Sequence, residues 1–293
     1  MMKKELPEIH FDKHKSLNIE VMDFEQLTTK LNQIKGHDPY TPHKIKFFLI
    51  LLVTQNTYTH FVDFNSYLLK EGSTLFVAKN QVHHFNQELQ KAQGYGIVFN
   101  HLFVDQHYYL GSHLRLNRLF NYHIESPLIE EPELREANFT DLFSNLHKEY
   151  LSKNHFAKSE ILAALLQVLL LKAEKAKALH AVDHINPHWL NTFNQFKTIL
   201  EKEYVNTRSS RAYASQLFVS YKLLNDIVKK LTGKTVKTFI DDFVTIEIKR
   251  HLISTSLSIN EISYLSGFEE PSNMVKFFKK NTGLTPLKFR QRP

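Results

Sequence analysis

The 293-residue chain contains no cysteine, only eight glycines and a single tryptophan. Without cysteine it can form neither a disulfide framework nor a thiolate metal site. It also lacks a glycine-rich phosphate loop, the GxSxG turn of hydrolases and the HExxH motif of metallopeptidases. Neighbouring acids such as Glu130–Glu131 and Asp241–Asp242 are typical of solvated surface. We therefore expect neither an enzyme nor a bound cofactor.

Long hydrophobic runs are also missing. The longest, Phe47–Val53 and Ile161–Leu171, fall well short of the roughly 20 residues that a membrane-spanning helix needs. The first residues, MMKKELPEIHFDKHK, lack the apolar core of a signal peptide. With 42% hydrophobic and 23% charged residues the chain can form true cores, and its length suits two domains. We expect a soluble, cytoplasmic protein without a membrane partner.

Positive charge is concentrated at the carboxyl end. The net charge is +7, and residues 188–293 hold 17 Lys and Arg against nine Asp and Glu. The first 187 residues hold 20 Lys and Arg against 21 Asp and Glu, so their net charge is close to zero. A domain with this excess attracts polyanions, and neutralising phosphates with release of counterions makes such binding sensitive to salt.

Residues 258–290 contain a helix-turn-helix pattern. Three apolar residues spaced three apart predict one packed face on a short helix: Ile259, Ile262 and Leu265. Gly267 suits a left-handed turn, Pro271 suits the first position of a new helix, and Gly283 suits its end. Met274, Phe277 and Phe278 would face inward on the second helix. Two short helices around a tight turn, the second one basic, are the outline of a DNA-binding motif.

The same plan occurs about 50 residues earlier, within 211–239. Ala214 and Leu217 are predicted to pack the first helix, and Ser220 is a candidate N-cap of the second. Four residues at helical spacing are predicted to face inward there: Leu224, Ile227, Val228 and Leu231. Gly233 would end the helix.

Here the chain resembles the AraC/XylS family of transcription regulators. The segments SINEIS, GFEEPSN and KFFKKNTGLTPLKFR match the family signature closely, and A..L.VS...L....K...G matches its first half. In that family a long helix joins the two helix-turn-helix units, which corresponds here to about 235–254. Two residues depart from the pattern: Val244 stands where the family usually has Arg, and Ile248 where it usually has Ala. Both departures concern the packing of the joining helix.

The outer faces of the two second helices supply candidate DNA contacts. Asn can pair with adenine through two hydrogen bonds and Lys can donate to guanine, so four residues are predicted base-edge readers: Lys222, Asn225, Asn273 and Lys276. Tyr221 and Ser272 would contact bases or phosphates. Lys229 and Lys280, together with Arg290, would meet phosphates or the domain itself. The predicted partner is double-stranded DNA.

The amino-terminal half reads as short strands from Lys44 to about Asn100. Turns are indicated near Asp63–Ser66, Glu71–Gly72 and Asn80–Gln81. Such spacing predicts a small antiparallel barrel. It is similar to the cupin-type sensing domain of AraC relatives, with a loose echo of its motif in QVHHF (81–85). The expected fold class is therefore α+β: a cupin-like antiparallel β-barrel with flanking helices, then an all-α domain of two helix-turn-helix units joined by a linker helix.

His43, His83 and His84 suggest a metal hypothesis, which we reject. A metal cupin needs two histidines separated by one residue, and no such pair occurs. Adjacent His83 and His84 would also point to opposite faces of one strand. No metal is therefore expected. The Phe- and Tyr-rich strands fit an apolar pocket for a small effector and a packed core equally well.

The segment 158–179 is predicted to be a helix with apolar residues on more than one side. Ile161, Leu165, Val168 and Leu169 would lie on one side, and Leu162, Leu166 and Leu170 towards another. One side would pack on the barrel, and the other would be buried within the chain or against a second copy. The family resemblance implies a homodimer through this helix. The segment 182–187 reads as a linker. We expect a sensing and dimerisation domain over 1–183 and a DNA-binding domain over 188–293.

Together these features predict a sequence-specific regulator that activates promoters, with RNA polymerase as a second macromolecular partner and a small-molecule effector. The alternative is a ligand-independent or partner-controlled regulator whose first domain serves only for oligomerisation. Basic helices that bind something other than promoter DNA form the competing class.

Overall fold

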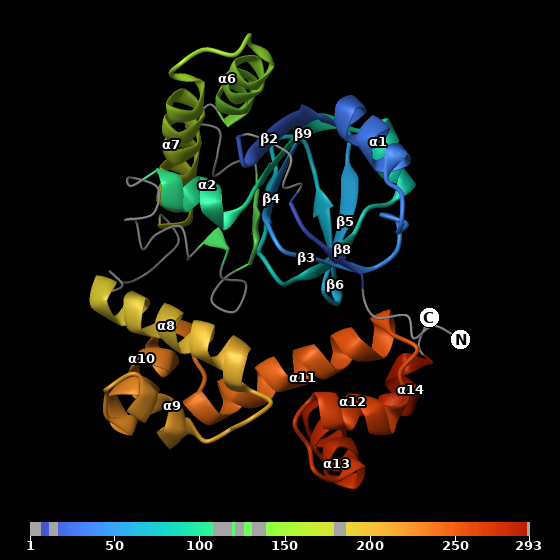
Figure 1. The fold of residues 1–293 in the computed structure, drawn as a ribbon, viewed down its shortest axis with the longest axis vertical. Coiled ribbons are helices and arrows are strands. Elements are labelled where there is room, and N and C mark those ends of the chain that lie inside the picture. The colour runs from blue at the N-terminus through green and yellow to red at the C-terminus, as the bar shows by residue number, and fades with distance from the viewer. Residues whose placement is uncertain are drawn as a thin grey trace. The chain divides into compact units, whose positions relative to one another are not determined.

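A computed structural model describes residues 7–11, 17–107, 119–120, 126–130, 139–178 and 186–291. Contacts divide the chain into two compact units, one formed by Pro7–Asp183 and the other by His184–Pro293 together with Met1–Leu6. The first is rich in strands and the second is helical (Figure 1).

Two five-stranded sheets make up the first unit. The first sheet has the order β1 (Glu8–Ile9), β3 (His43–Ile45), β8 (Val82–His84), β5 (Tyr58–Val62) and β6 (Asn65–Leu69). The second has the order β10 (Leu128–Ile129), β7 (Thr74–Val77), β4 (Phe48–Gln55), β9 (Gln93–Phe99) and β2 (Ile19–Asp23). The described strand pairs are antiparallel except β1 with β3.

The predicted cupin-like, antiparallel architecture is confirmed, although strand pairing gives two sheets rather than one closed ring. One core cluster takes residues from both sheets, among them Ile45 and Tyr58 from the first and Leu49 and Leu51 from the second. Burial between two faces explains the apolar run of β4. The predicted turns are present: Asp63, Gly72 and Asn80 all have positive φ, of 53°, 81° and 71°.

Helices flank these sheets. They are α1 (Phe24–Gln33), α2 (His101–Gln106), α6 (Phe139–Leu151) and α7 (Lys158–Ala178), with a 3-10 turn, η1, at Gln87–Lys91. A second core cluster joins α6 and α7 to strands β2, β4 and β9. Helix α1, which hydrophobic patterning did not reveal, begins with a capping box formed by Asp23 and Gln26. Residues 182–185 of the predicted linker 182–187 lie outside the described residues, whereas Asn186 caps the next helix and Pro187 begins it.

Seven helices form the second unit. They are α8 (Pro187–Glu203), α9 (Ser210–Gln216), α10 (Tyr221–Thr232), α11 (Val236–Ser254), α12 (Ile259–Leu265), α13 (Pro271–Thr282) and α14 (Pro286–Arg290) among the described residues. The pairs α9–α10 and α12–α13 lie towards opposite ends of α11 (Figure 1), as predicted for two helix-turn-helix units on a joining helix. No helix in the described part of the chain is long and apolar enough to span a bilayer.

Candidate nucleic-acid interface

Helix α10 presents one buried and one exposed face. Ser220 caps it by accepting a 3.1 Å hydrogen bond from the N–H of Leu223, and Gly233 ends it at φ 72°. The four residues predicted to face inward are all buried: Leu224, Ile227, Val228 and Leu231. The opposite face leaves Tyr221, Lys222 and Lys229 exposed to solvent. The amphipathic pattern thus fixes which side of α10 can meet a partner.

Asn225 differs from the other predicted base readers. It is half-buried, and its Oδ1 accepts a hydrogen bond of 3.2 Å from the backbone N–H of Val236, the first residue of α11. Pairing with adenine through two hydrogen bonds needs both Oδ1 and Nδ2 of an Asn side chain. In this arrangement only Nδ2 of Asn225 can bind a base, unless Oδ1 gives up its hydrogen bond to Val236.

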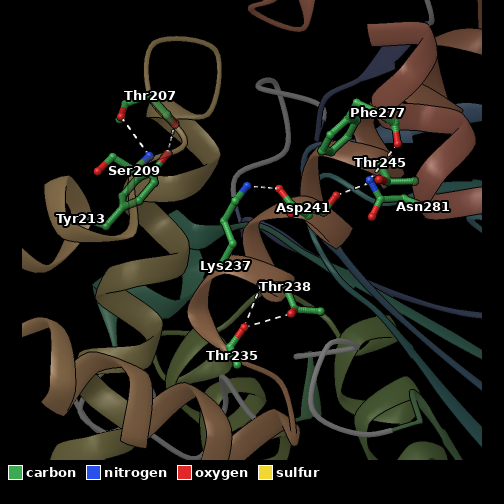
Figure 2. Close-up of polar contacts among 10 residues, drawn as sticks. All are labelled: Thr207, Ser209, Tyr213, Thr235, Lys237, Thr238, Asp241, Thr245, Phe277 and Asn281. Carbon is green, nitrogen blue, oxygen red and sulfur yellow. Dashed lines mark hydrogen bonds and ion pairs between the residues drawn. The ribbon is translucent and has the colours of Figure 1, made fainter. Parts of the chain in front are cut away.

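Helix α13 repeats the design in the second unit. Met274 and Phe278 are fully buried, Phe277 is half-buried, and Gly283 ends the helix at φ 75°. Pro271 occupies its first position, as predicted. The predicted contact residues on this helix are all exposed: Ser272, Asn273, Lys276 and Lys280. A side-chain hydrogen bond from Asn281 to the carbonyl oxygen of Phe277, at 2.8 Å, lies in its last turn (Figure 2).

Two features of the leading helices differ from the sequence prediction. Leu265 was expected to pack inward, but it is 49% exposed. The buried face of α12 is formed by Ile262 together with Ser263, and Ser266, just beyond the end of the helix, is also buried. A pattern of apolar residues does not indicate such small polar residues. In α9, Ala214 is buried but Leu217 only half-buried, and Tyr213 fills the core. Its hydroxyl donates to the carbonyl oxygen of Thr207 at 2.7 Å (Figure 2).

Helix α11 forms the core that both units share. Val244 and Ile248, the departures from the family pattern, are fully buried, so they serve packing. Its first turns carry an ion pair of 2.5 Å between Lys237 and Asp241, and the hydroxyl of Thr245 donates to the carbonyl oxygen of Asp241 at 2.7 Å (Figure 2). The helix therefore connects the two helix-turn-helix units through residues that are buried along its whole length, among them the ion pair of Glu247 with Arg250.

A second contact between the two helix-turn-helix units does not involve α11. Arg208, in the loop before α9, donates to the carbonyl oxygen of Ser266 at 2.6 Å. Its guanidinium carbon lies 3.6 Å from the ring centroid of Phe268, within cation–π range. Burial lowers the pKa of this guanidinium, but an arginine side chain stays charged in proteins. The loop before the first helix-turn-helix unit is thus bound to the turn of the second helix-turn-helix unit.

Close backbone packing strengthens this link. Gly267 has φ 74°, and a Cβ added there would lie 2.1 Å from the carbonyl oxygen of Val205. Gly267 and Val205 are about 60 residues apart in sequence, as are Arg208 and Ser266, and no local sequence pattern predicts either contact. Sequence reasoning therefore missed Arg208 and Val205 as residues that hold the two units together. At the far end, Arg290 Nε donates to the carbonyl oxygen of Leu252 at 3.1 Å, so Arg290 binds the domain itself.

The amino-terminal unit, Pro7–Asp183, contains a partly open cavity of about 470 Å³, lined by β1, α1 and facing strands. His43 and His83 border it, whereas the half-buried ring of His84 stacks on Phe61 with centroids 4.6 Å apart. Adjacent His83 and His84 therefore diverge, as the alternation of a strand predicts. Among the described residues no group of three or more His, Asp or Glu is placed to hold a metal ion.

Known families match both units. Residues 34–170 match the family described as AraC-like ligand binding domain, and residues 213–292 match the helix-turn-helix domain family. The Msm operon regulatory protein of Streptococcus mutans is 33% identical over 33% of this chain and 35% of its own length. The bifunctional transcriptional activator/DNA repair enzyme AdaA of Bacillus subtilis is 25% identical over 35% of this chain and 47% of its own.

The chain spans less than half the length of the curated relatives that it matches. Among solved structures, ToxT from Vibrio cholerae covers 84% of this chain, and 89% of ToxT is matched, at 13% identity and a TM-score of 0.44.

Proposed function

Because this chain belongs to the AraC family of DNA-binding transcription regulators, we propose that one chain reads two successive major grooves on one face of a duplex. Helix α10 would enter the first groove and α13 the second. The observation that carries the proposal is the pair of exposed polar helix faces that α11 and the Arg208 contact hold within one helical unit. The excess of basic residues in 188–293 supports it.

Within this proposal the exposed residues take different roles. Asn273 and Lys276 of α13 and Lys222 of α10 read base edges. Asn225 contributes through its Nδ2 alone, so its share in specificity is smaller than that of Asn273. Tyr221 and Ser272 contact bases or phosphates, and Lys229 and Lys280 neutralise phosphates.

Selection of tight binders from random duplexes, followed by gel shifts of the full chain against random competitor DNA, tests these roles. Asn273→Ala should lower the preference for the selected site by roughly 1–3 kcal/mol. Lys276→Ala should also relax specificity, whereas Lys202→Ala, which removes an exposed charge of the same sign from α8, should leave the preference unchanged. If Asn273→Ala and Lys276→Ala keep the full preference, the assignment of base readers is wrong. A chain that never prefers one duplex supports the competing class of basic module.

We further propose that residues 1–183 form a sensing and dimerisation domain, that 188–293 form the DNA-binding domain, and that the regulator activates promoters in the cytoplasm by contacting RNA polymerase. The cavity of about 470 Å³ supports an effector. The alternative is a regulator controlled without a ligand, in which the first domain only oligomerises. Saturable binding of a small molecule that changes DNA affinity favours the first reading.

Helix α7 is the proposed dimer contact. Its buried side includes Leu162, Leu166 and Leu169, so Leu169 lies in the same core as Leu162 and Leu166, although the sequence grouped it on the other side with Ile161 and Val168. Ile161 and Val168 are 38% and 41% exposed, and they lie on one face because residues seven apart align on a helix. An apolar face of this kind fits a second copy of the same helix.

Substituting Ile161→Asp together with Val168→Asp should turn a dimer into a monomer with little loss of folding stability, because both side chains are partly exposed. Light scattering and urea unfolding measure the two properties. Glu160→Ala, on an exposed neighbour, is the control. A dimer that survives the double substitution would place the contact elsewhere.

A further inference from the structure

A relay of buried hydrogen bonds ends at the wall of the 470 Å³ cavity in the amino-terminal unit. The hydroxyl of Tyr58 lies 2.9 Å from His60 Nδ1, and His60 Nε2 lies 3.0 Å from His83 Nδ1. All three side chains are at most 2% exposed. His83 borders the cavity, and its Nε2 is buried without a hydrogen-bond partner. A buried polar atom of this kind normally has a partner, so an acceptor or donor is required here.

The direction of the relay follows from its far end. The hydroxyl of Tyr58 is fully buried, and a buried O–H needs an acceptor for its proton. His60 Nδ1 lies 2.9 Å away, so the Tyr58 proton points at His60 Nδ1. His60 then donates from Nε2 to His83 Nδ1. A neutral His83 consequently carries its proton on Nε2, next to the cavity.

His43 presents the opposite group. Its Nδ1 lies 2.9 Å from the carbonyl oxygen of Thr41, which can only accept, so the ring proton is on Nδ1. Burial lowers the pKa of His43 to about 4 and that of His83 well below its ordinary value, so both rings are neutral near pH 7. His43 Nε2 is then a bare acceptor. The two rings lie with centroids 4.5 Å apart, which places a donor and an acceptor side by side.

Apolar side chains and paired charges make up most of the rest of the cavity wall. Its buried apolar lining includes Met22, Leu27, Leu31, Leu49 and Phe85. Lys30 forms an ion pair with the buried carboxylate of Glu20. Glu8 forms another with Lys46, at 2.8 Å. The two acids at the walls thus pair with lysines, and the further base Lys35 is exposed to solvent, so a ligand charge buried in the cavity would have to break one of these pairs.

We propose that this cavity binds a neutral, largely apolar molecule with one hydroxyl group, an alcohol or a phenol, which His43 and His83 hold. The hydroxyl oxygen accepts from His83 Nε2–H, and the hydroxyl proton is donated to His43 Nε2. This inference depends on the proposed effector function and names the ligand class for it. A volume of about 470 Å³ suits a small organic molecule.

Three probes that differ only in the polar group test the proposal: 4-butylphenol, its methyl ether 4-butylanisole, and 4-butylbenzoate. Calorimetry and thermal shift of the full chain measure binding, because a ligand of the native state raises Tm. We expect 4-butylphenol to bind at least about tenfold more tightly than the ether, which cannot donate to His43, or the benzoate, which brings a charge.

Variants locate the site. His43→Phe should abolish the preference for the phenol over the ether, and His83→Phe should weaken both probes. If His83→Phe does not fold, His83→Gln serves in its place. His84→Phe, on the next residue of the same strand but stacked on Phe61, should bind like the wild type. Thr28→Val alters a separate, more open recess of about 730 Å³ on α1 and should also have no effect.

Equal affinity for phenol and ether, tighter binding of the benzoate, no binding of 4-butylphenol, or a loss caused by Thr28→Val would each overturn the inference. Gel shifts without any probe measure the DNA-binding proposal separately. A chain that binds its selected duplex but fails these probe tests would leave the regulator intact and refute only the ligand class.

Discussion

The two helix-turn-helix units share a plan but differ in how their turns are held. In the second, Gly267 takes the left-handed conformation, and Ser266 and Phe268 on either side are buried. In the first, Phe218 has φ 56° and is 97% exposed. The second turn is therefore packed into the unit, whereas the first stands in solvent and stores backbone strain. The difference teaches that contacts with the rest of the domain hold the second turn, whereas the exposed Phe218 gives the first turn no such contact.

The largest expected effect comes from adding one methyl group to the packed turn. Gly267→Ala combines a positive φ with a Cβ only 2.1 Å from the Val205 oxygen, so it should destabilise the helical unit by about 3 kcal/mol. Gly283→Ala, also at positive φ but with nothing within 4 Å, should cost about 1–2 kcal/mol. Urea unfolding followed by the fluorescence of Trp189, the single tryptophan, reports on this unit. Equal losses would contradict the close packing.

Removing the arginine that reaches the second turn should have the next largest effect. Arg208→Ala loses a charge-assisted hydrogen bond and a cation–π contact, worth about 2 kcal/mol together. DNA affinity should fall as well, because the units lose their fixed separation. Arg211→Ala removes an exposed charge of the same sign in α9 and is the matched control. If both variants behave alike, charge alone rather than the contact explains the result.

Asn225 tests whether the first unit is fastened to α11. Asn225→Ala deprives the Val236 N–H of its acceptor and should cost about 1 kcal/mol of folding stability. Asn225→Asp keeps an acceptor beside the amino end of α11 and should retain the stability. Fifty residues later the aligned position is Val275, which has no such polar group. A stable Asn225→Ala variant would mean that the hydrogen bond contributes little.

The exposed turn should give the smallest effect, of opposite sign. Phe218→Asn relieves the left-handed strain without losing packing, so stability should rise by about 0.5–1 kcal/mol. Phe218→Leu keeps the strain and should leave stability unchanged. A loss of stability in Phe218→Asn would show that the aromatic ring makes a contact in the folded chain.

Local patterns carried much of this architecture. Glycines at helix ends, Ser220, Pro271 and the apolar stripe of α10 predicted the helical units, because each acts over a few residues. Leu265 was misplaced because Ser263 and Ser266, rather than apolar residues, carry the buried face there.

Long-range contacts were beyond prediction from one sequence. The bond from Arg208 to Ser266, the capture of Asn225 by Val236 and the meeting of His43 with His83 join residues whose neighbours in sequence give no sign of them. For the same reason the strands were predicted, but their division into two sheets was not. The exposed helix faces of the candidate site could thus be predicted from the sequence, whereas the contacts that hold these helices in place could not.

The most direct test of the central claim is the spacing of the selected DNA site. If α11 and the Arg208 contact hold α10 and α13 at one separation, inserting five or ten base pairs between the two recognised segments should lower affinity at least about tenfold in both cases. An insertion of ten base pairs returns the second segment to the same face of the duplex, but it also lengthens the distance between the two segments. Gel shifts of the full chain on the three duplexes measure this. Recovery of affinity with the ten-base-pair insertion, or no loss with either, would contradict a rigid two-groove reader.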